Sequence, residues 1–166
     1  MADKRLCVLA GYDDQTSQRL DNLKECLKDF ETQETKGLPH HITLCSAPTE
    51  REAEIKRAMI AAAKDIKAFP ITFNHIGIFG GAKVLFISPD VSFSLLKLKE
   101  RFGDSWNWTA HTTMLISDPD MIIKASSVLS KTFNAFIGKM DCLYLYEFFP
   151  ARLICSIKLK KSDNAL

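Results

Sequence analysis

A three-residue pattern, histidine followed by any residue and then threonine, occurs twice in this chain, at equivalent places in two similar halves. The copies are His41-Ile42-Thr43 and His111-Thr112-Thr113. Each copy opens an apolar run with the residue types of a β-strand, and each run is followed by a proline-marked helix start and then by a hairpin. A solenoid needs more repeats than two, so this duplication favours two similar lobes related by an approximate two-fold axis.

The periodicity of the apolar residues predicts the elements of both halves. Thr49 followed by Glu52 is typical of a capping box, and Asp118-Pro119 is typical of a helix N-terminus. Helices are expected over about 14–31, from 49 onward, over 95–102 and over about 118–133, and strands over 5–12, 41–47, 69–79, 82–88, 111–117, 140–149 and 151–160. We therefore expect an α+β fold in which residues 1–166 form one bilobal domain. Its antiparallel-rich sheets would carry helices on their outer sides and enclose a central groove.

The composition is that of a soluble globular protein, with 46% hydrophobic and 25% charged residues. A net charge of +2 is too small to indicate a general nucleic-acid coat, although a basic strip inside one groove would suffice for a phosphate ligand. No apolar run has the length of a membrane span or of a signal peptide. The five cysteines form no CxxC pair, which indicates reduced thiols. We expect a cytoplasmic monomer with no membrane partner.

The paired motifs bring acid–base chemistry to the groove. Side chains two residues apart on a strand share a face, so each motif presents an imidazole together with a hydroxyl. If the two faces meet, His41, His111, Thr43 and Thr113 surround one gap. Histidine can both accept and donate a proton near neutral pH, and threonine can donate to phosphate oxygens. The sequence thus predicts attack on a phosphodiester with no metal and no cofactor. It leaves open which histidine is the base.

The two motifs, in the contexts PHHITL and AHTTML, resemble those of the two-histidine (2H) phosphoesterase superfamily, in its 2′-5′ RNA ligase-like and cyclic phosphodiesterase branch. The resemblance covers nearly the whole chain, because the repeated lobe matches the bilobal architecture of that family. It implies hydrolysis of 2′,3′-cyclic phosphates or 2′,5′ linkages of RNA ends or nucleotides, or the reverse ligation. It also implies catalytic roles for His41 and His111 and phosphate-binding roles for Thr43 and Thr113.

Two other functions remain open at this stage. Ligase-type members of that family often carry an arginine shortly after the second motif, where this chain has Ile116. The phenylalanine–leucine–glycine run that often follows their first motif is replaced here by Ser46-Ala47-Pro48. These differences leave the histidine pair intact, and they are the sequence support for the alternative of a non-catalytic module that binds RNA ends or nucleotides. A metal-dependent hydrolase is the weaker alternative, because the four histidines lack recognisable ligand spacing.

Several aromatic and histidine side chains have roles that the pattern does not fix. Trp108 and Tyr12 are candidates for stacking on a base, as is Trp106, and Tyr144 and Tyr146 are expected in the core. His40 should face away from His41 on the strand and have a surface or capping role. His75, in an apolar strand without a matching partner, is expected to be structural.

Overall fold

The computed structural model describes residues 4–31 and 37–161, which contain one seven-stranded sheet. The strands are β1 (Arg5–Tyr12), β2 (His41–Pro48), β3 (Phe69–Ile78), β4 (Val84–Pro89), β5 (Thr112–Ile116), β6 (Phe136–Phe148) and β7 (Arg152–Lys158). They are ordered β2-β1-β6-β3-β4-β5, with β7 also paired to β6, and every ladder is antiparallel. With four α-helices beside it, this sheet confirms the α+β class.

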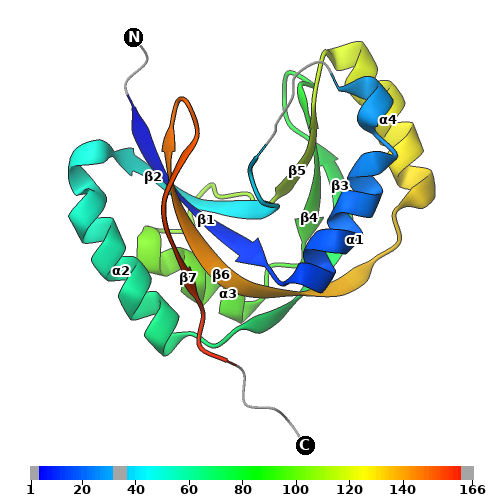
Figure 1. Cartoon of the computed structure of the whole chain (residues 1–166). Helices are drawn as coiled ribbons and strands as arrows, with labels where there is room; N and C mark the ends of the chain where they lie inside the picture. Colours follow the sequence, from blue (N-terminus) through cyan, green and yellow to red (C-terminus); the bar gives the residue numbers. More distant parts are fainter. Residues whose placement is uncertain (1–3, 32–36, 162–166) are drawn as a thin grey trace, which may run out of the picture.

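Strand β6 divides the sheet into two wings (Figure 1). Its later residues, Met140–Phe148, pair with β1, while its first residues, Phe136–Met140, pair with β3. At about 3.3 Å per residue, 13 residues span about 43 Å, enough to serve both wings. One wing therefore consists of β2, β1, β7 and the end of β6. The other consists of the start of β6 with β3, β4 and β5. The two wings belong to one continuous sheet.

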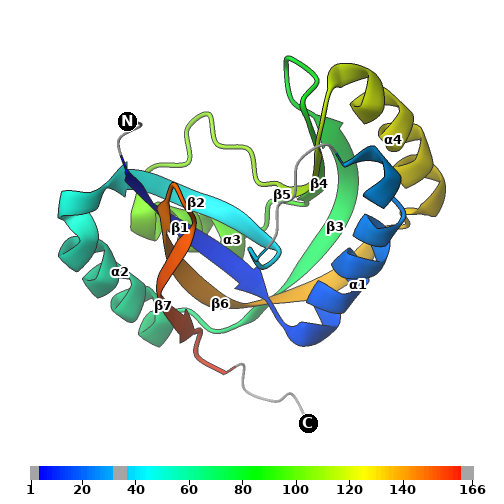
Figure 2. The ribbon, with the colours of Figure 1, turned by 45° about the horizontal axis from the view of Figure 1, so that its top comes forward.

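The helices cover the outer sides of the wings (Figures 1 and 2). They are α1 (Asp14–Glu25), α2 (Glu52–Asp65), α3 (Phe93–Lys99) and α4 (Pro119–Thr132), with 3₁₀ turns η1 (Lys28–Phe30), η2 (Thr49–Arg51) and η3 (Glu100–Phe102). Helix α4 packs on β3 and β4, whereas α2 packs on β6 and β7. Both bury one apolar stripe, which in α4 contains Ile122, Ala125 and Leu129. No helix in the described ranges is both long and apolar enough to span a membrane.

The wings do not correspond to the two halves of the sequence. The hairpin β3–β4 belongs to the first half but pairs with β5 of the second, and β6 of the second half pairs with β1 of the first. Each wing is thus built from both halves, because the long β6 lies between the two sets of strands. A repeat in sequence does not by itself say whether its copies fold separately or exchange hairpins.

The element ends differ from the sequence prediction in three places. Thr49 makes no capping bond: it starts η2, and α2 begins at Glu52, so the predicted capping box is wrong. The first helix ends at Glu25 and continues only as η1. Strand β6 begins at Phe136, before the predicted strand, because its first residues pair with β3. The predicted hairpin at Gly80-Gly81 is confirmed.

The two strands that carry the repeated motifs, β2 and β5, stand at opposite ends of the sheet path. The sheet curves so far that they nevertheless meet, with Cα atoms within 8 Å of each other. In both ribbon views β2 begins near β5 and runs away from it (Figures 1 and 2). The curvature of the sheet therefore brings together two segments that are far apart in sequence.

Candidate active site

Both repeated motifs show the alternation that the sequence predicts. In β2, Ile42 and Leu44 are buried in the core, whereas His41 and Thr43 are only half-buried. The second motif follows the same rule: Thr112 and Met114 are 1% exposed, and the residues between and before them face outward. Successive strand residues point to opposite faces, so each imidazole shares its face with the hydroxyl two residues on.

The two motifs meet crosswise at two adjoining pockets. His41 lines one pocket, of about 370 Å³, together with Thr113 of the other motif. His111 lines a second pocket, of about 320 Å³, together with Thr43. We call these the His41-side pocket and the His111-side pocket. Each pocket is lined by the histidine of one motif and the threonine of the other, which places the two motifs side by side.

Both imidazoles are held in the same way. Nδ1 of His41 lies 2.8 Å from the carbonyl oxygen of Pro39, and Nδ1 of His111 lies 2.8 Å from that of Thr109, in each case two residues earlier in the chain. A carbonyl oxygen only accepts, so Nδ1 of each neutral ring carries the hydrogen and Nε2 keeps the lone pair. Nε2 is therefore the atom with which either ring can take or give a proton.

Burial lowers the pKa of His41. The contact with the Pro39 carbonyl opposes this shift, while the positive charges that His111 and His40 carry when protonated lower the pKa further. A lowered pKa keeps His41 neutral at neutral pH, which is the form of a proton acceptor.

Helix α1 contributes polar groups to the His41-side pocket. Ser17, Asp21 and Lys24 follow helical spacing and line it. Asp21 lies 2.7 Å from Nε2 of His40, which lines the same pocket beside His41. His40 thus borders the same pocket as His41, while its ring pairs with Asp21 of α1.

The aromatic candidates separate into two groups. Trp108 lines the His111-side pocket, and its indole N–H donates to the carbonyl oxygen of Thr43 at 3.0 Å. Trp106, on the same loop, is 82% exposed. Tyr12 is 3% exposed, and its ring packs edge-on against Phe73 in the core, so its proposed role in base stacking is wrong. The position of Tyr12 at the end of a predicted strand did not show whether its side chain lies in the groove or in the core.

The sequence profile of the 2′-5′ RNA ligase superfamily matches residues 12–125, which include both motifs. This chain belongs to the 2′-5′ RNA ligase superfamily. The family expected from the paired motifs, that of the 2H phosphoesterases, is thus confirmed. A comparison with curated protein sequences found no match.

Solved structures share the fold of this superfamily member. TT0787 of Thermus thermophilus superposes with a TM-score of 0.63 at 13% identity, covering 96% of this chain and 100% of that one. LigT of E. coli complexed with ATP gives 0.59 at 15% identity, covering 95% and 98%. LigT complexed with 3′-AMP gives 0.57 at 15% identity, covering 95% and 99%. At such identities the likeness concerns the fold alone.

Other polar groups lie apart from this superfamily's paired motifs. His75 is exposed and lies 3.7 Å from a carboxylate oxygen of Asp90. Tyr146 is buried and Tyr144 half-buried on β6. Across residues 4–31 and 37–161, no three or more His, Cys, Asp or Glu side chains are arranged as ligands for a metal ion.

Two phenylalanines that the sequence did not single out fix the ring of His111. Phe79 meets it edge-on, with centroids 4.7 Å apart, and Phe86 lies at 5.4 Å. Phe86 occupies the space above Gly77, its partner in the β3–β4 ladder. A Cβ on Gly77 would lie 2.3 Å from the Phe86 ring. The absence of a side chain at Gly77 thus allows the packing around His111, and a glycine inside a predicted strand was the available signal.

Replacing Gly77 with alanine is expected to lower the free energy of unfolding by about 1–3 kcal/mol, because the new methyl group must displace the Phe86 ring. Urea denaturation measures this loss. Gly80→Ala is the matched control, since a Cβ there meets nothing within 4 Å. Equal midpoints for the two variants would show that Phe86 moves freely and does not hold His111.

Proposed function

We propose that this chain is a phosphoesterase that cleaves a phosphodiester of an RNA end or related nucleotide, with His41 and His111 as its acid–base pair. The observation that carries this proposal is the matched geometry of the two rings. Each Nδ1 is engaged by the carbonyl two residues earlier, which leaves two Nε2 atoms for one groove. Membership of a superfamily of RNA-end ligases and phosphoesterases supports it.

In the proposed reaction, His41 accepts a proton from water or from a ribose hydroxyl while that oxygen bonds to phosphorus. The bond to the leaving oxygen breaks on the opposite side. His111 enters this step as the imidazolium, with Nδ1–H held by the Thr109 carbonyl, and donates its Nε2 proton to that oxygen, which leaves the ring neutral. The lowered pKa of His41 favours it as the acceptor. Each proton transfer by a positioned imidazole contributes about 10²–10⁴ in rate.

The hydroxyls of Thr43 and Thr113 are proposed to donate to the non-bridging oxygens of the phosphoryl group. Each threonine lies on the same strand face as one histidine and lines a pocket with the other. Two threonines thus flank the phosphorus from opposite strands. Donors placed where charge develops are worth about 10²–10³ each in rate.

The substrate classes that we propose are 2′,3′-cyclic phosphates and 2′,5′-linked phosphodiesters. The two pockets give space on both sides of the histidine pair, one bordered by Trp108 and Phe79 and the other by polar groups of α1. An aromatic border suits a nucleobase, so Trp108 remains a candidate for base stacking. Nucleotide ligands in LigT complexes accord with a nucleotide in this groove. Both motifs come from one chain, so the proposed site is complete in a monomer.

A binding module without turnover is the second candidate. Ile116, at the place of the arginine frequent in ligase-type members, is 37% exposed and borders the His41-side pocket. The groove therefore lacks a fixed positive charge at that position. A phosphate held there would depend on neutral donors, on the imidazoles and on Lys24 of α1, which lines the same pocket.

Incubation with a panel of 2′,3′-cyclic nucleotides and 2′,5′-linked dinucleotides, with and without a chelator, tests the proposal. We expect chromatography to resolve a monophosphate from the cyclic substrates or two fragments from the dinucleotides, at equal rates in both conditions. Binding without product would favour the module. Product that disappears with the chelator would replace the paired-imidazole mechanism by a metal-dependent one. Neither binding nor product would overturn the proposed function.

A further inference from the structure

The separation of the two imidazoles is not set by the sheet alone. His41 and His111 belong to opposite ends of the strand order, so five antiparallel ladders lie between them. The twist between neighbouring strands varies by several degrees from pair to pair, and small changes at five ladders accumulate. Acid–base catalysis on one phosphorus tolerates displacements of only about half an ångström. A site built on the first and last strands therefore needs a direct connection.

One direct connection lies on the buried side of the motifs. The Tyr12 and Thr112 hydroxyls share a hydrogen bond of 2.6 Å, and the two residues are 3% and 1% exposed. Thr112 stands between His111 and Thr113, with its side chain on the opposite face of β5. Tyr12 follows the residue of β1 that pairs with His41. This bond thus ties the back of one motif to the strand beside the other.

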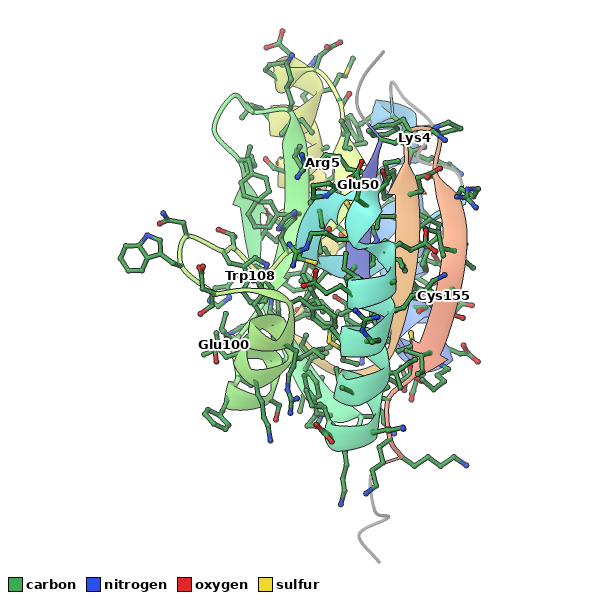
Figure 3. The ribbon with its side chains drawn as sticks, turned by 90° about the vertical axis from the view of Figure 1, so that its left-hand side faces the viewer. Lys4, Arg5, Glu50, Glu100, Trp108 and Cys155 are labelled. Atoms are coloured by element: carbon green, nitrogen blue, oxygen red, sulfur yellow. The ribbon has the colours of Figure 1, made fainter. Side chains whose placement is uncertain are left out.

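A second connection lies on the groove side. Within residues 4–31 and 37–161, strand β2 has only one ladder partner, β1, so its outer edge carries backbone groups that the sheet does not pair. Trp108 satisfies one of them, because its indole N–H donates to the carbonyl oxygen of Thr43 at 3.0 Å. Trp108 precedes His111 by three residues, and Thr43 follows His41 by two. Figure 3 labels Trp108 on the loop between η3 and β5, beside β2.

The loop that carries Trp108 is itself held in place. The Lys99 ammonium donates to the carbonyl oxygens of Gly103 and Asp104, although Lys99 is only 5% exposed. It also lies 5.8 Å from the centre of the Trp108 ring. A buried charge is retained in folded proteins when it is well paired, and here its partners are the first residues of the loop. The indole is therefore supported from α3 while its N–H reaches β2.

We propose that Tyr12 and Trp108 are positioning residues, which fix the spacing of His41 and His111. Tyr12 does so by its hydrogen bond on the buried side of the motifs, and Trp108 by its hydrogen bond on the groove side. This inference rests on the proposed function, in which the two imidazoles act on one phosphorus. It gives Tyr12, which is too buried to touch a substrate, a role in the reaction. It gives the Trp108 N–H a role separate from any stacking by its ring.

The test removes each hydrogen bond while keeping the packing. For the buried bond, Tyr12→Phe is combined with Thr112→Val, because removing both partners leaves no unsatisfied hydroxyl. For the rim, Trp108→Phe removes the N–H and retains an aromatic ring, and Trp106→Phe on the same loop is the control. We expect kcat to fall by about tenfold to 10²-fold in the double variant and in Trp108→Phe, with KM within twofold and an unchanged urea midpoint. Trp106→Phe should match the original chain.

Three kinetic outcomes would overturn the inference. Unchanged kcat in both the double variant and Trp108→Phe would make the two bonds features of packing alone. A raised KM with unchanged kcat in Trp108→Phe would make the indole a substrate contact. A loss of kcat that follows the urea midpoint would show a loss of folded protein.

An NMR titration of the His41 imidazole tests the inference even if the chain has no catalytic activity. The groups that face His41 are His111 across the groove, His40 beside it, and Asp21 and Lys24 of α1. Burial and the charge of His111 both lower the pKa of His41, so loosening the connection should raise that pKa in the Tyr12 and Trp108 variants. An unchanged titration of His41 in both variants would contradict the inference. Failure of the proposed function would appear separately, as an original chain without product.

Discussion

Asparagine in place of His41 or His111 should lower kcat by about 10²–10⁴-fold and leave the fold intact. An asparagine amide nitrogen can occupy the position of Nδ1 and still donate to the carbonyl of Pro39 or Thr109, which holds the native ring at 2.8 Å. The substitution removes Nε2, the only atom of either ring left to exchange a proton. Steady-state kinetics on the substrates turned over by the original chain measures the loss, and urea denaturation measures the fold.

His75→Asn is the matched control for both variants, because His75 is exposed and pairs with Asp90 outside the two pockets. It should retain full activity. The double variant of His41 and His111 should lose much less than the product of the two single losses, since residues that act as a unit are not additive. A single variant that keeps most of its activity would remove that histidine from the proposed mechanism.

The local part of the groove follows from the sequence. Alternation along a strand predicts that Ile42 and Leu44 are buried and that His41 and Thr43 share the other face, and both residue pairs lie as predicted. The carbonyl that engages each Nδ1 is also a local feature, because in both motifs it lies two residues before its histidine. Two copies of one short pattern therefore give two copies of one local geometry.

The long-range part does not follow from the sequence. The exchange of hairpins between the halves depends on β6 being long enough to pair with both β1 and β3. A sequence repeat does not predict this exchange. The bond from Trp108 to the Thr43 backbone joins residues far apart in the chain. Its acceptor is a backbone carbonyl, and because every residue has one, the sequence does not identify the partner. The wrong prediction for Tyr12 has the same cause. Its hydroxyl bonds to Thr112 of β5, which lies far along the sequence, and local pattern does not show this contact.

Lowering the pH should reduce kcat/KM through a limb whose midpoint lies below 6.5, the ordinary histidine pKa. A base must be neutral to accept a proton, and burial together with the charges of His111 and His40 lowers the pKa of His41. The neutral ring therefore persists to lower pH than in an exposed histidine. Two pH units below the midpoint, kcat/KM should be about 10²-fold lower, because only the neutral fraction reacts.

Replacing His40 with asparagine assigns that limb to a residue. Burial lowers the pKa of His40 itself, so the change removes a charge that lowers the pKa of His41 only at pH values at which His40 is protonated, and it leaves the Asp21 carboxylate without the ring at 2.7 Å. Both effects stabilise protonated His41, so the acidic limb should move to higher pH, while His75→Asn leaves it in place. A limb that stayed in place would contradict the role of His41 as the base, and the roles that we give the two histidines would have to be exchanged.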